Sequence, residues 1–219
     1  MSKVMLTRPV LIGLYGYPGS GKTHVARNLS SYIQIAHVDT DRIRSELFET
    51  PRFDAQESAI VGHLMNYMSE EFLGAGVSVV YDSNTNRLAG RRNLREIARK
   101  HKAHFLLVWI QIDSESAYAR TQDRDRRTND DRYAQPQTPE SFEANIRAMQ
   151  NPRDEDYLVI SGKHSFVTQK NAIVNRLYQM GLVSTENVQS QVAMPELVNL
   201  VPNPQAGRVD LSRRNISIR

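Results

Sequence analysis

The sequence predicts an α/β fold in which a parallel five-stranded sheet carries helices on both of its faces. Short apolar runs of the kind that form buried parallel strands recur along the chain. A segment with apolar residues at helical spacing follows almost every one of them. Strands that alternate with helices in this way form a parallel sheet, and ligands bind at the carboxyl ends of its strands. At 219 residues the chain is long enough to bury the core of one such domain.

The first unit of this fold is a strand, a glycine-rich turn and a helix. Residues 10–15 form an apolar run between a proline and a glycine cluster, which is typical of a fully buried strand. Residues 23–32 place Val25, Ala26 and Leu29 on one side, as an amphipathic helix does. The remaining strands are expected at residues 33–38, 77–81, 105–112 and 157–160, and the remaining helices at 40–48, 55–73, 87–101, 115–127, 140–149 and 165–180.

The helix expected at residues 55–73 is the longest in the chain. Its apolar residues recur at helical spacing, and two glycines follow it, which is typical of a helix terminus. The apolar residues are Ile60, Leu64, Tyr67 and Met68.

The helix expected at residues 87–101 is predicted to be an outer helix with a strongly basic face. The chain as a whole is weakly basic, with a formal net charge of +4 and a pI of about 9.4. Because the planar guanidinium of arginine suits phosphate, this bias favours an anionic partner, and nucleic acid is one candidate. The arginines of the basic face are Arg91, Arg92, Arg95 and Arg99.

The composition excludes several classes of site. Cysteine is absent, so disulfides, thiolate zinc sites and cysteine nucleophiles are excluded. The longest apolar stretch near the start, residues 9–15, is far too short to span a bilayer. We therefore expect a cytoplasmic protein with no membrane span and no export signal.

One motif in the sequence carries a specific chemistry. The segment Gly-Tyr-Pro-Gly-Ser-Gly-Lys-Thr at residues 16–23 matches the P-loop pattern and lies between an expected strand and an expected helix. In such a loop the backbone N–H groups hold phosphate oxygens, Lys22 reaches the β- and γ-phosphates, and the Thr23 hydroxyl binds Mg²⁺. We expect ATP or GTP, with Mg²⁺, to be bound by Gly16, Pro18, Gly19, Ser20, Gly21, Lys22 and Thr23.

Acidic residues follow the second and third expected strands. Asp41 and Arg44 are one helical turn apart, so a carboxylate that takes a proton from an attacking hydroxyl could stand beside an arginine that binds the substrate. A helix N-cap is an equally good interpretation of Asp41, although Asp39 is better placed for a cap or for supporting a neighbour. Asp82 is predicted to hold Mg²⁺ through water and to contact the substrate, and an Asx turn is the alternative.

Arginines at helical spacing mark a candidate lid at about residues 115–138. Arg120, Arg124 and Arg127 precede a polar segment that ends in prolines. Arginines of a lid meet the negative charge that develops on a transferring phosphoryl group, and the lid excludes water. We favour Arg120 and Arg124 as functional residues, against the alternative of a solvated face that pairs with the interleaved aspartates.

In this order and spacing, these motifs resemble the polynucleotide-kinase and zeta-toxin branch of P-loop kinases. The resemblance covers about residues 10–180 and implies a P-loop NTPase fold with a helical lid. It implies a kinase that transfers the γ-phosphoryl group to a hydroxyl. It also implies that Asp41 is the base for that hydroxyl, that Arg44 contacts the substrate and that Arg124 contacts the transferring phosphate.

The resemblance leaves the acceptor open. The best match is the 5′-hydroxyl of a nucleic acid, because this acceptor accounts for the arginine bias. A small-molecule kinase of the zeta-toxin type, acting on a nucleotide sugar, a nucleoside or an antibiotic, accounts for the same core. A regulatory ATPase would explain the P-loop, but it would leave the pairing of Asp41 with Arg44 without a function.

The end of the chain differs in character from the rest. From about residue 184 it is rich in Gln, Asn, Ser and Pro, and its last twenty residues carry several arginines. We therefore expect a kinase domain at residues 1–183 and an appendage at residues 184–219. The arginines of the appendage would bind nucleic acid or seal an interface in a homo-oligomer.

Overall fold

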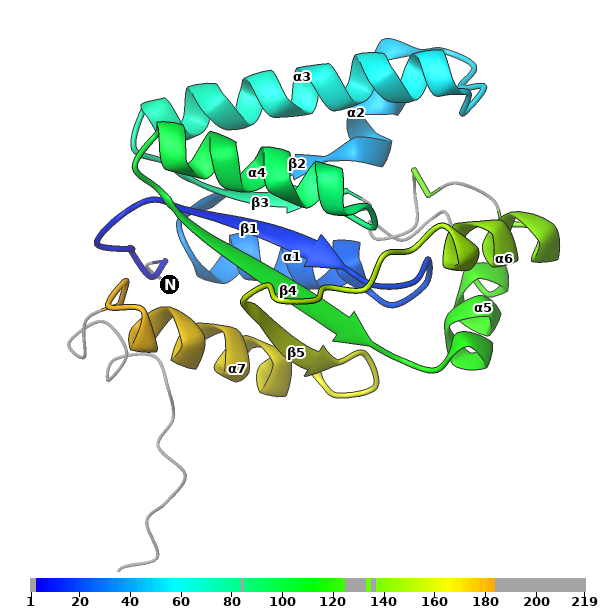
Figure 1. Ribbon diagram of the computed structural model, residues 1–219. Helices are drawn as coiled ribbons and strands as arrows, with labels where there is room; N and C mark the ends of the chain where they lie inside the picture. Colours follow the sequence, from blue (N-terminus) through cyan, green and yellow to red (C-terminus); the bar gives the residue numbers. More distant parts are fainter. Residues whose placement is uncertain (1–2, 84, 125–132, 135–136, 184–219) are drawn as a thin grey trace, which may run out of the picture.

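The computed structural model describes residues 3–83, 85–124, 133–134 and 137–183, and it has the predicted architecture. All five strands lie parallel in the order β2-β3-β1-β4-β5, with helices on both faces of the sheet (Figure 1). The strands are β1 (Val10–Tyr15), β2 (Ile35–Asp39), β3 (Ser78–Asp82), β4 (His104–Gln111) and β5 (Tyr157–Ser161). The helices are α1 (Lys22–Tyr32), α2 (Thr40–Leu47), α3 (Ala55–Gly74), α4 (Leu88–Lys100), α5 (Ser114–Gln122), α6 (Pro139–Arg147) and α7 (Phe166–Gln179). The expected appendage at residues 184–219 lies outside the described residues.

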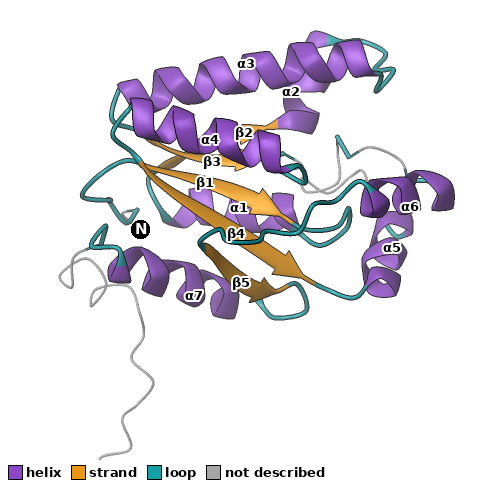
Figure 2. Cartoon of the chain, in the orientation of Figure 1, coloured by secondary structure: helices purple, strands orange, loops and turns teal. Residues whose placement is uncertain are grey.

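The strand side chains alternate between two hydrophobic cores, as the period of a strand requires. Ile12 of the central strand packs in the core that α1 and α7 cover, whereas its neighbour Leu11 packs in the core that α3 and α4 cover. Helices α5 and α6 lie beyond the carboxyl ends of the strands rather than on a face of the sheet (Figure 2). Among the described helices, none combines the length and the apolar character that a membrane span needs.

The predicted elements match the structure apart from their ends. The second strand begins at Ile35, two residues later than expected, because Ile33 closes α1 by donating its backbone N–H to Leu29. The fifth helix, expected to run to residue 127, ends at Gln122, where the backbone N–H of Asp123 closes its last turn. The rest of the expected lid lies partly outside the described residues.

The apolar residues that mark α3 in the sequence do not form its buried face. Ile60 is 46% exposed and Tyr67 is 58% exposed, while the neighbouring stripe, shifted by one residue, is buried. Two residues of the buried stripe are polar, so the stripe cannot be recognised from apolar residues in the sequence. The buried stripe consists of Glu57, Val61, Met65, Ser69 and Leu73.

The prediction of a strongly basic outer face on α4 is wrong for two of its four arginines. The Arg91 side chain is 1% exposed, and its guanidinium donates to both carboxylate oxygens of Glu155 and to the carbonyl oxygen of Thr85. Arg95 pairs with the same carboxylate. Glu155 lies 64 residues from Arg91 along the chain, so no local pattern indicates this ion pair. The charges of Arg91 and Arg95 are therefore neutralised by Glu155, while the other two arginines of the face remain exposed.

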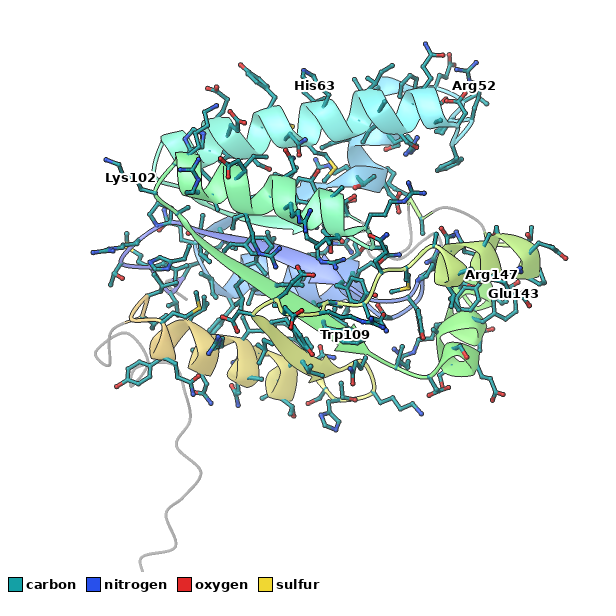
Figure 3. The ribbon with its side chains drawn as sticks, in the orientation of Figure 1. Arg52, His63, Lys102, Trp109, Glu143 and Arg147 are labelled. Carbon is teal, nitrogen blue, oxygen red and sulfur yellow. The ribbon has the colours of Figure 1, made fainter. Side chains whose placement is uncertain are left out.

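This buried pair makes a prediction for stability. Glu155→Gln is expected to lower the free energy of unfolding by about 2–3 kcal/mol, because it leaves the buried Arg91 guanidinium without a counter-charge. Urea unfolding followed by circular dichroism measures the change. Glu143→Gln is the matched control, since Glu143 pairs with Arg147 on the surface of α6 (Figure 3), and its loss is expected to cost less than about 0.5 kcal/mol. Equal effects of the two substitutions would contradict this account.

Candidate active site

The glycine-rich loop joins β1 to α1 at the carboxyl edge of the sheet. Gly19 has a φ of +78°, and a Cβ atom at this position would lie 2.1 Å from the carbonyl oxygen of Ala117, so only glycine fits. Gly21 is the N-cap of α1 in the left-handed conformation, and no side chain caps this end of the helix. The first N–H groups of α1 are therefore available to an anion, as phosphate binding requires.

A single cavity of about 820 Å³ gathers the predicted site residues. Its walls come from the glycine-rich loop, the start of α2, the end of β3, the end of α5 and the turn between β5 and α7. Every predicted site residue except Gly16 lines it, and the Gly16 carbonyl accepts a hydrogen bond from Lys22. The predicted residues in the wall are Pro18, Gly19, Ser20, Gly21, Lys22, Thr23, Asp41, Arg44, Asp82, Arg120 and Arg124.

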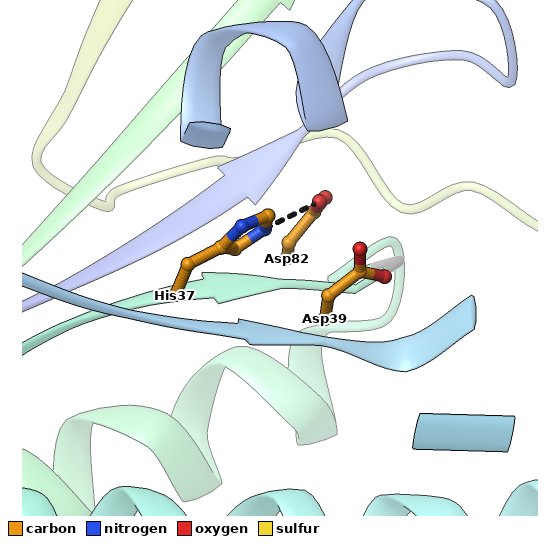
Figure 4. Close-up of side chains that lie close together, drawn as sticks. All are labelled: His37, Asp39 and Asp82. Carbon is orange, nitrogen blue, oxygen red and sulfur yellow. Dashed lines mark hydrogen bonds and ion pairs between the residues drawn. The ribbon is translucent and has the colours of Figure 1, made fainter. Parts of the chain in front are cut away.

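Two buried carboxylates stand side by side at the ends of neighbouring strands. Asp39 of β2 and Asp82 of β3 are partners in the parallel register. Asp39 caps α2, because its Oδ1 accepts from the backbone N–H groups of Asp41 and Arg42. His37, two residues before Asp39, reaches Asp82 with a distance of 3.0 Å between Nε2 and Oδ2 (Figure 4). The cap of α2 is thus Asp39, and the N-cap interpretation of Asp41 is wrong.

A family model described as an AAA domain matches residues 11–149, more than half of the chain. The chain belongs to this AAA domain family. No curated protein matches its sequence.

The fold of this AAA domain is also similar to that of several solved structures, at low sequence identity. A sugar kinase from Janibacter sp. HTCC2649 has 12% identity and a TM-score of 0.55, with 80% of this chain and 95% of that chain covered. Kti12 from Chaetomium thermophilum, in complex with ADP-AlF3, has 16% identity and a TM-score of 0.58, with 77% and 97% covered. APS kinase from Mycobacterium tuberculosis, in complex with AMPPNP and APS, has 18% identity and a TM-score of 0.56, with 78% and 98% covered. The predicted P-loop NTPase fold is confirmed.

Lys22 of the AAA domain lies across the glycine-rich loop. Its Nζ donates to the carbonyl oxygens of Gly16 at 2.9 Å and Tyr17 at 2.8 Å. Burial lowers the pKa of Lys22 to about 8, an effect that Asp82 opposes and the charge of Arg124 reinforces. Lys22 is therefore held as a donor at the mouth of the loop, beside the acidic residues of the cavity.

Asp41 is a partly buried carboxylate in the wall of this cavity. Burial raises its pKa to about 7, and the negative charges of Asp39 and Asp82 act in the same direction, while Arg124 and Arg44 oppose them. Within residues 3–83, 85–124, 133–134 and 137–183, no hydrogen bond to its carboxylate is found. A carboxylate with these properties can exchange a proton near neutral pH, as a general base must.

Arg44 lies in the cavity wall as one half of a buried ion pair. Its NH1 is 3.2 Å from the Glu57 carboxylate, its NH2 donates to Ser58, and its guanidinium stands over the Phe53 ring. Glu57 also accepts from the backbone N–H groups of Arg52 and Phe53. Arg44 is thus held rigidly next to Asp41, with its charge already balanced.

The two predicted lid arginines differ in their surroundings. Arg120, in the last turn of α5, donates to the carbonyl oxygen of Gly162 at 2.9 Å and so joins α5 to the turn after β5. Arg124 follows the end of α5 and lines the cavity, where its charge acts on both Lys22 and Asp41. Arg127 and most of the segment after it lie outside the described residues.

The oxygen atoms at the strand ends fit a hard divalent cation. In the described part of the chain, ligand atoms of His37, Asp39 and Asp82 lie within 4.8 Å of one another. Burial and the neighbouring Asp82 raise the pKa of Asp39, which reflects the cost of placing two carboxylates together. Mg²⁺ prefers carboxylate and hydroxyl oxygens and keeps several of its waters, so Thr23 and Asp82 are the residues that would hold it.

Several site residues were missed in the sequence. His37 carries a usable signal, because a polar residue at an inward position of a buried strand needs a partner. Glu57 and the turn at residues 162–166 carry no such signal, because Glu57 acts through its ion pair with Arg44 and the turn comes to the cavity from a distant part of the chain.

Proposed function

We propose that this AAA domain is a Mg²⁺-dependent kinase that transfers the γ-phosphoryl group of ATP or GTP to an alcohol group on a small molecule. The observation that carries the proposal is Asp41, which lies in the cavity that holds the P-loop lysine, accepts no hydrogen bond from the described residues and has a pKa raised to about 7. A site that only binds nucleotide has no use for such a base. The fold alone would support nucleotide binding and no particular reaction.

The chemistry follows from the placement of these side chains. The N–H groups at the start of α1 and the Lys22 ammonium bind the phosphates. Asp41 accepts the proton of the acceptor hydroxyl as its oxygen bonds to the γ-phosphorus, and the bond from that phosphorus to the β-γ bridging oxygen breaks to release the nucleoside diphosphate. Arg124 and Arg120, which both line the cavity, stabilise the negative charge on the transferring group. Thr23, and through water Asp82, would hold Mg²⁺, which would neutralise further phosphate charge when bound.

The structure bears on the choice between acceptors. The basic face of α4 was one argument for a nucleic acid, and two of its four arginines, Arg91 and Arg95, are paired with Glu155. Arg44, predicted to bind an anionic substrate group, is likewise balanced by Glu57. The cavity volume of about 820 Å³ falls in the range of sites for small ligands. A small hydroxyl-bearing molecule is therefore the first candidate for the acceptor, and the 5′-hydroxyl of a nucleic acid is the second.

Label transfer from γ-labelled ATP and GTP to a panel of acceptors tests this proposal. The panel contains sugars, nucleosides, amino sugars, nucleotide sugars, and hydroxyl-ended DNA and RNA. We expect label on a small molecule. Label on the oligonucleotides, together with binding that weakens steeply as salt increases, would establish the second candidate, because phosphate contacts release counterions. Label on no acceptor, with steady release of inorganic phosphate, would favour a regulatory ATPase.

The reaction is expected to depend on pH through Asp41 and Lys22. Asp41 must be deprotonated to act as a base, so kcat/KM for the nucleotide is expected to fall as the pH decreases below about 7. Lys22 must be charged to bind phosphate, so the same quantity is expected to fall as the pH rises above about 8. Initial rates between about pH 5.5 and 9 measure both limbs. A profile that stays flat across this range would contradict the assignment of both residues.

A further inference from the structure

His37 occupies an unusual place in the sheet. It lies in β2 on the same side as Ile35 and Asp39, because strand side chains alternate. Ile35 packs in the core that α1 covers, so His37 points into the layer between the sheet and α1. An apolar residue would be expected in this layer. The chain instead places the imidazole of His37 there, next to the carboxylates of Asp39 and Asp82 (Figure 4).

The hydrogen bond between His37 and Asp82 joins Nε2 to Oδ2 over 3.0 Å. In the tautomer that carries its hydrogen on Nε2, His37 donates to this oxygen, because an ionised carboxylate only accepts. Among the described residues this is the one hydrogen bond to the Asp82 carboxylate. His37 does not line the cavity, whereas Asp82 does. A ligand in the cavity therefore meets Asp82 and not His37.

We propose that His37 is a positioning residue that orients Asp82 for the metal ion of the bound nucleotide. The inference rests on the proposed function, since it assigns Asp82 to that metal ion. Asp39 is fixed by the two N–H groups of α2, and His37 fixes Asp82 by one oxygen, which leaves the other oxygen of Asp82 for a metal-bound water. Asp39 and Asp82 are thus each held by hydrogen-bond donors of their own. Groups that orient metal-binding carboxylates in this way affect metal affinity strongly.

The test measures binding of Mn²⁺, used in place of Mg²⁺, to the full chain with a non-hydrolysable nucleotide, by the electron paramagnetic resonance signal of free Mn²⁺. His37→Leu removes the donor and is expected to weaken Mn²⁺ binding about tenfold. His37→Gln keeps an N–H at a similar distance and is expected to restore affinity to within about threefold of the wild type. Nucleotide affinity without a divalent ion is expected to be the same in all three proteins. His63→Leu, on the outer side of α3 (Figure 3), is the control for losing an imidazole.

A double-mutant cycle of His37 and Asp82 distinguishes a positioning role of His37 from a role in packing alone. If His37 acts through Asp82, then Asp82→Asn and the double variant Asp82→Asn/His37→Leu bind Mn²⁺ equally. Unchanged Mn²⁺ affinity in His37→Leu overturns the proposal, and so does a His37→Gln protein as weak as His37→Leu. If His37→Leu does not fold, His37→Met takes its place in the same comparison. Because no step of this test measures phosphoryl transfer, failure of the proposed kinase reaction would appear separately, in the acceptor panel.

Discussion

Lys22→Ala is expected to lower the rate of phosphoryl transfer by at least about 10³-fold, or about 4 kcal/mol of transition-state stabilisation. The Lys22 ammonium lies at the mouth of the P-loop, held by the Gly16 and Tyr17 carbonyl oxygens, and its charge is the one that the loop offers to the β- and γ-phosphates. Alanine keeps the helix and the loop backbone while removing that charge. Single-turnover transfer from γ-labelled nucleotide measures the loss.

The control for this substitution is Lys100→Ala. Lys100 lies at the end of α4, where it pairs with Glu70 on the surface. Its loss is expected to leave both transfer and nucleotide affinity unchanged within about twofold. A Lys22→Ala protein that transfers phosphate at more than about a tenth of the wild-type rate would contradict the role given to the loop.

Asp41→Asn is expected to slow transfer by about 10²- to 10⁴-fold while leaving nucleotide affinity within about threefold of the wild type. Asparagine has nearly the same shape and cannot take a proton. The cap of α2 is not disturbed, because Asp39 and not Asp41 provides it. Transfer kinetics and equilibrium nucleotide binding, measured on the same preparation, separate the two effects.

The matched control is Asp156→Asn, which removes an exposed carboxylate that pairs with Arg176. It is expected to change neither transfer nor binding. Normal transfer by Asp41→Asn would rule out Asp41 as the base. Equal losses of transfer and nucleotide binding would instead assign Asp41 to nucleotide binding.

The fold could be predicted because its signals are local. Each buried strand is a short apolar run, and each helix start or end carries its own marker, such as Gly21 before α1 or Thr138 and Pro139 at the start of α6. The face of α3 could not be predicted in the same way. Two adjacent stripes of that helix are apolar, and the buried one includes Glu57, whose partner Arg44 lies on another helix.

The site was predictable where one segment carries the chemistry, as the P-loop does. It was less predictable where distant segments meet. Arg91 looked like a surface charge because Glu155, which buries it, comes much later in the chain. His37 was missed because the neighbouring strand that supplies Asp82 is 45 residues away. Register between strands, and not spacing along the chain, brings these groups together.

In the proposed reaction, Asp41 directs the γ-phosphoryl group to a hydroxyl instead of to water. The most direct test follows the label of γ-labelled nucleotide in matched single-turnover reactions of the wild type and Asp41→Asn with the acceptor found in the panel. We predict that the wild type places the label on the acceptor, and that Asp41→Asn binds nucleotide normally but forms the labelled product at least about 10²-fold more slowly. Label that appears only as inorganic phosphate, at the same rate in both proteins, would contradict the account.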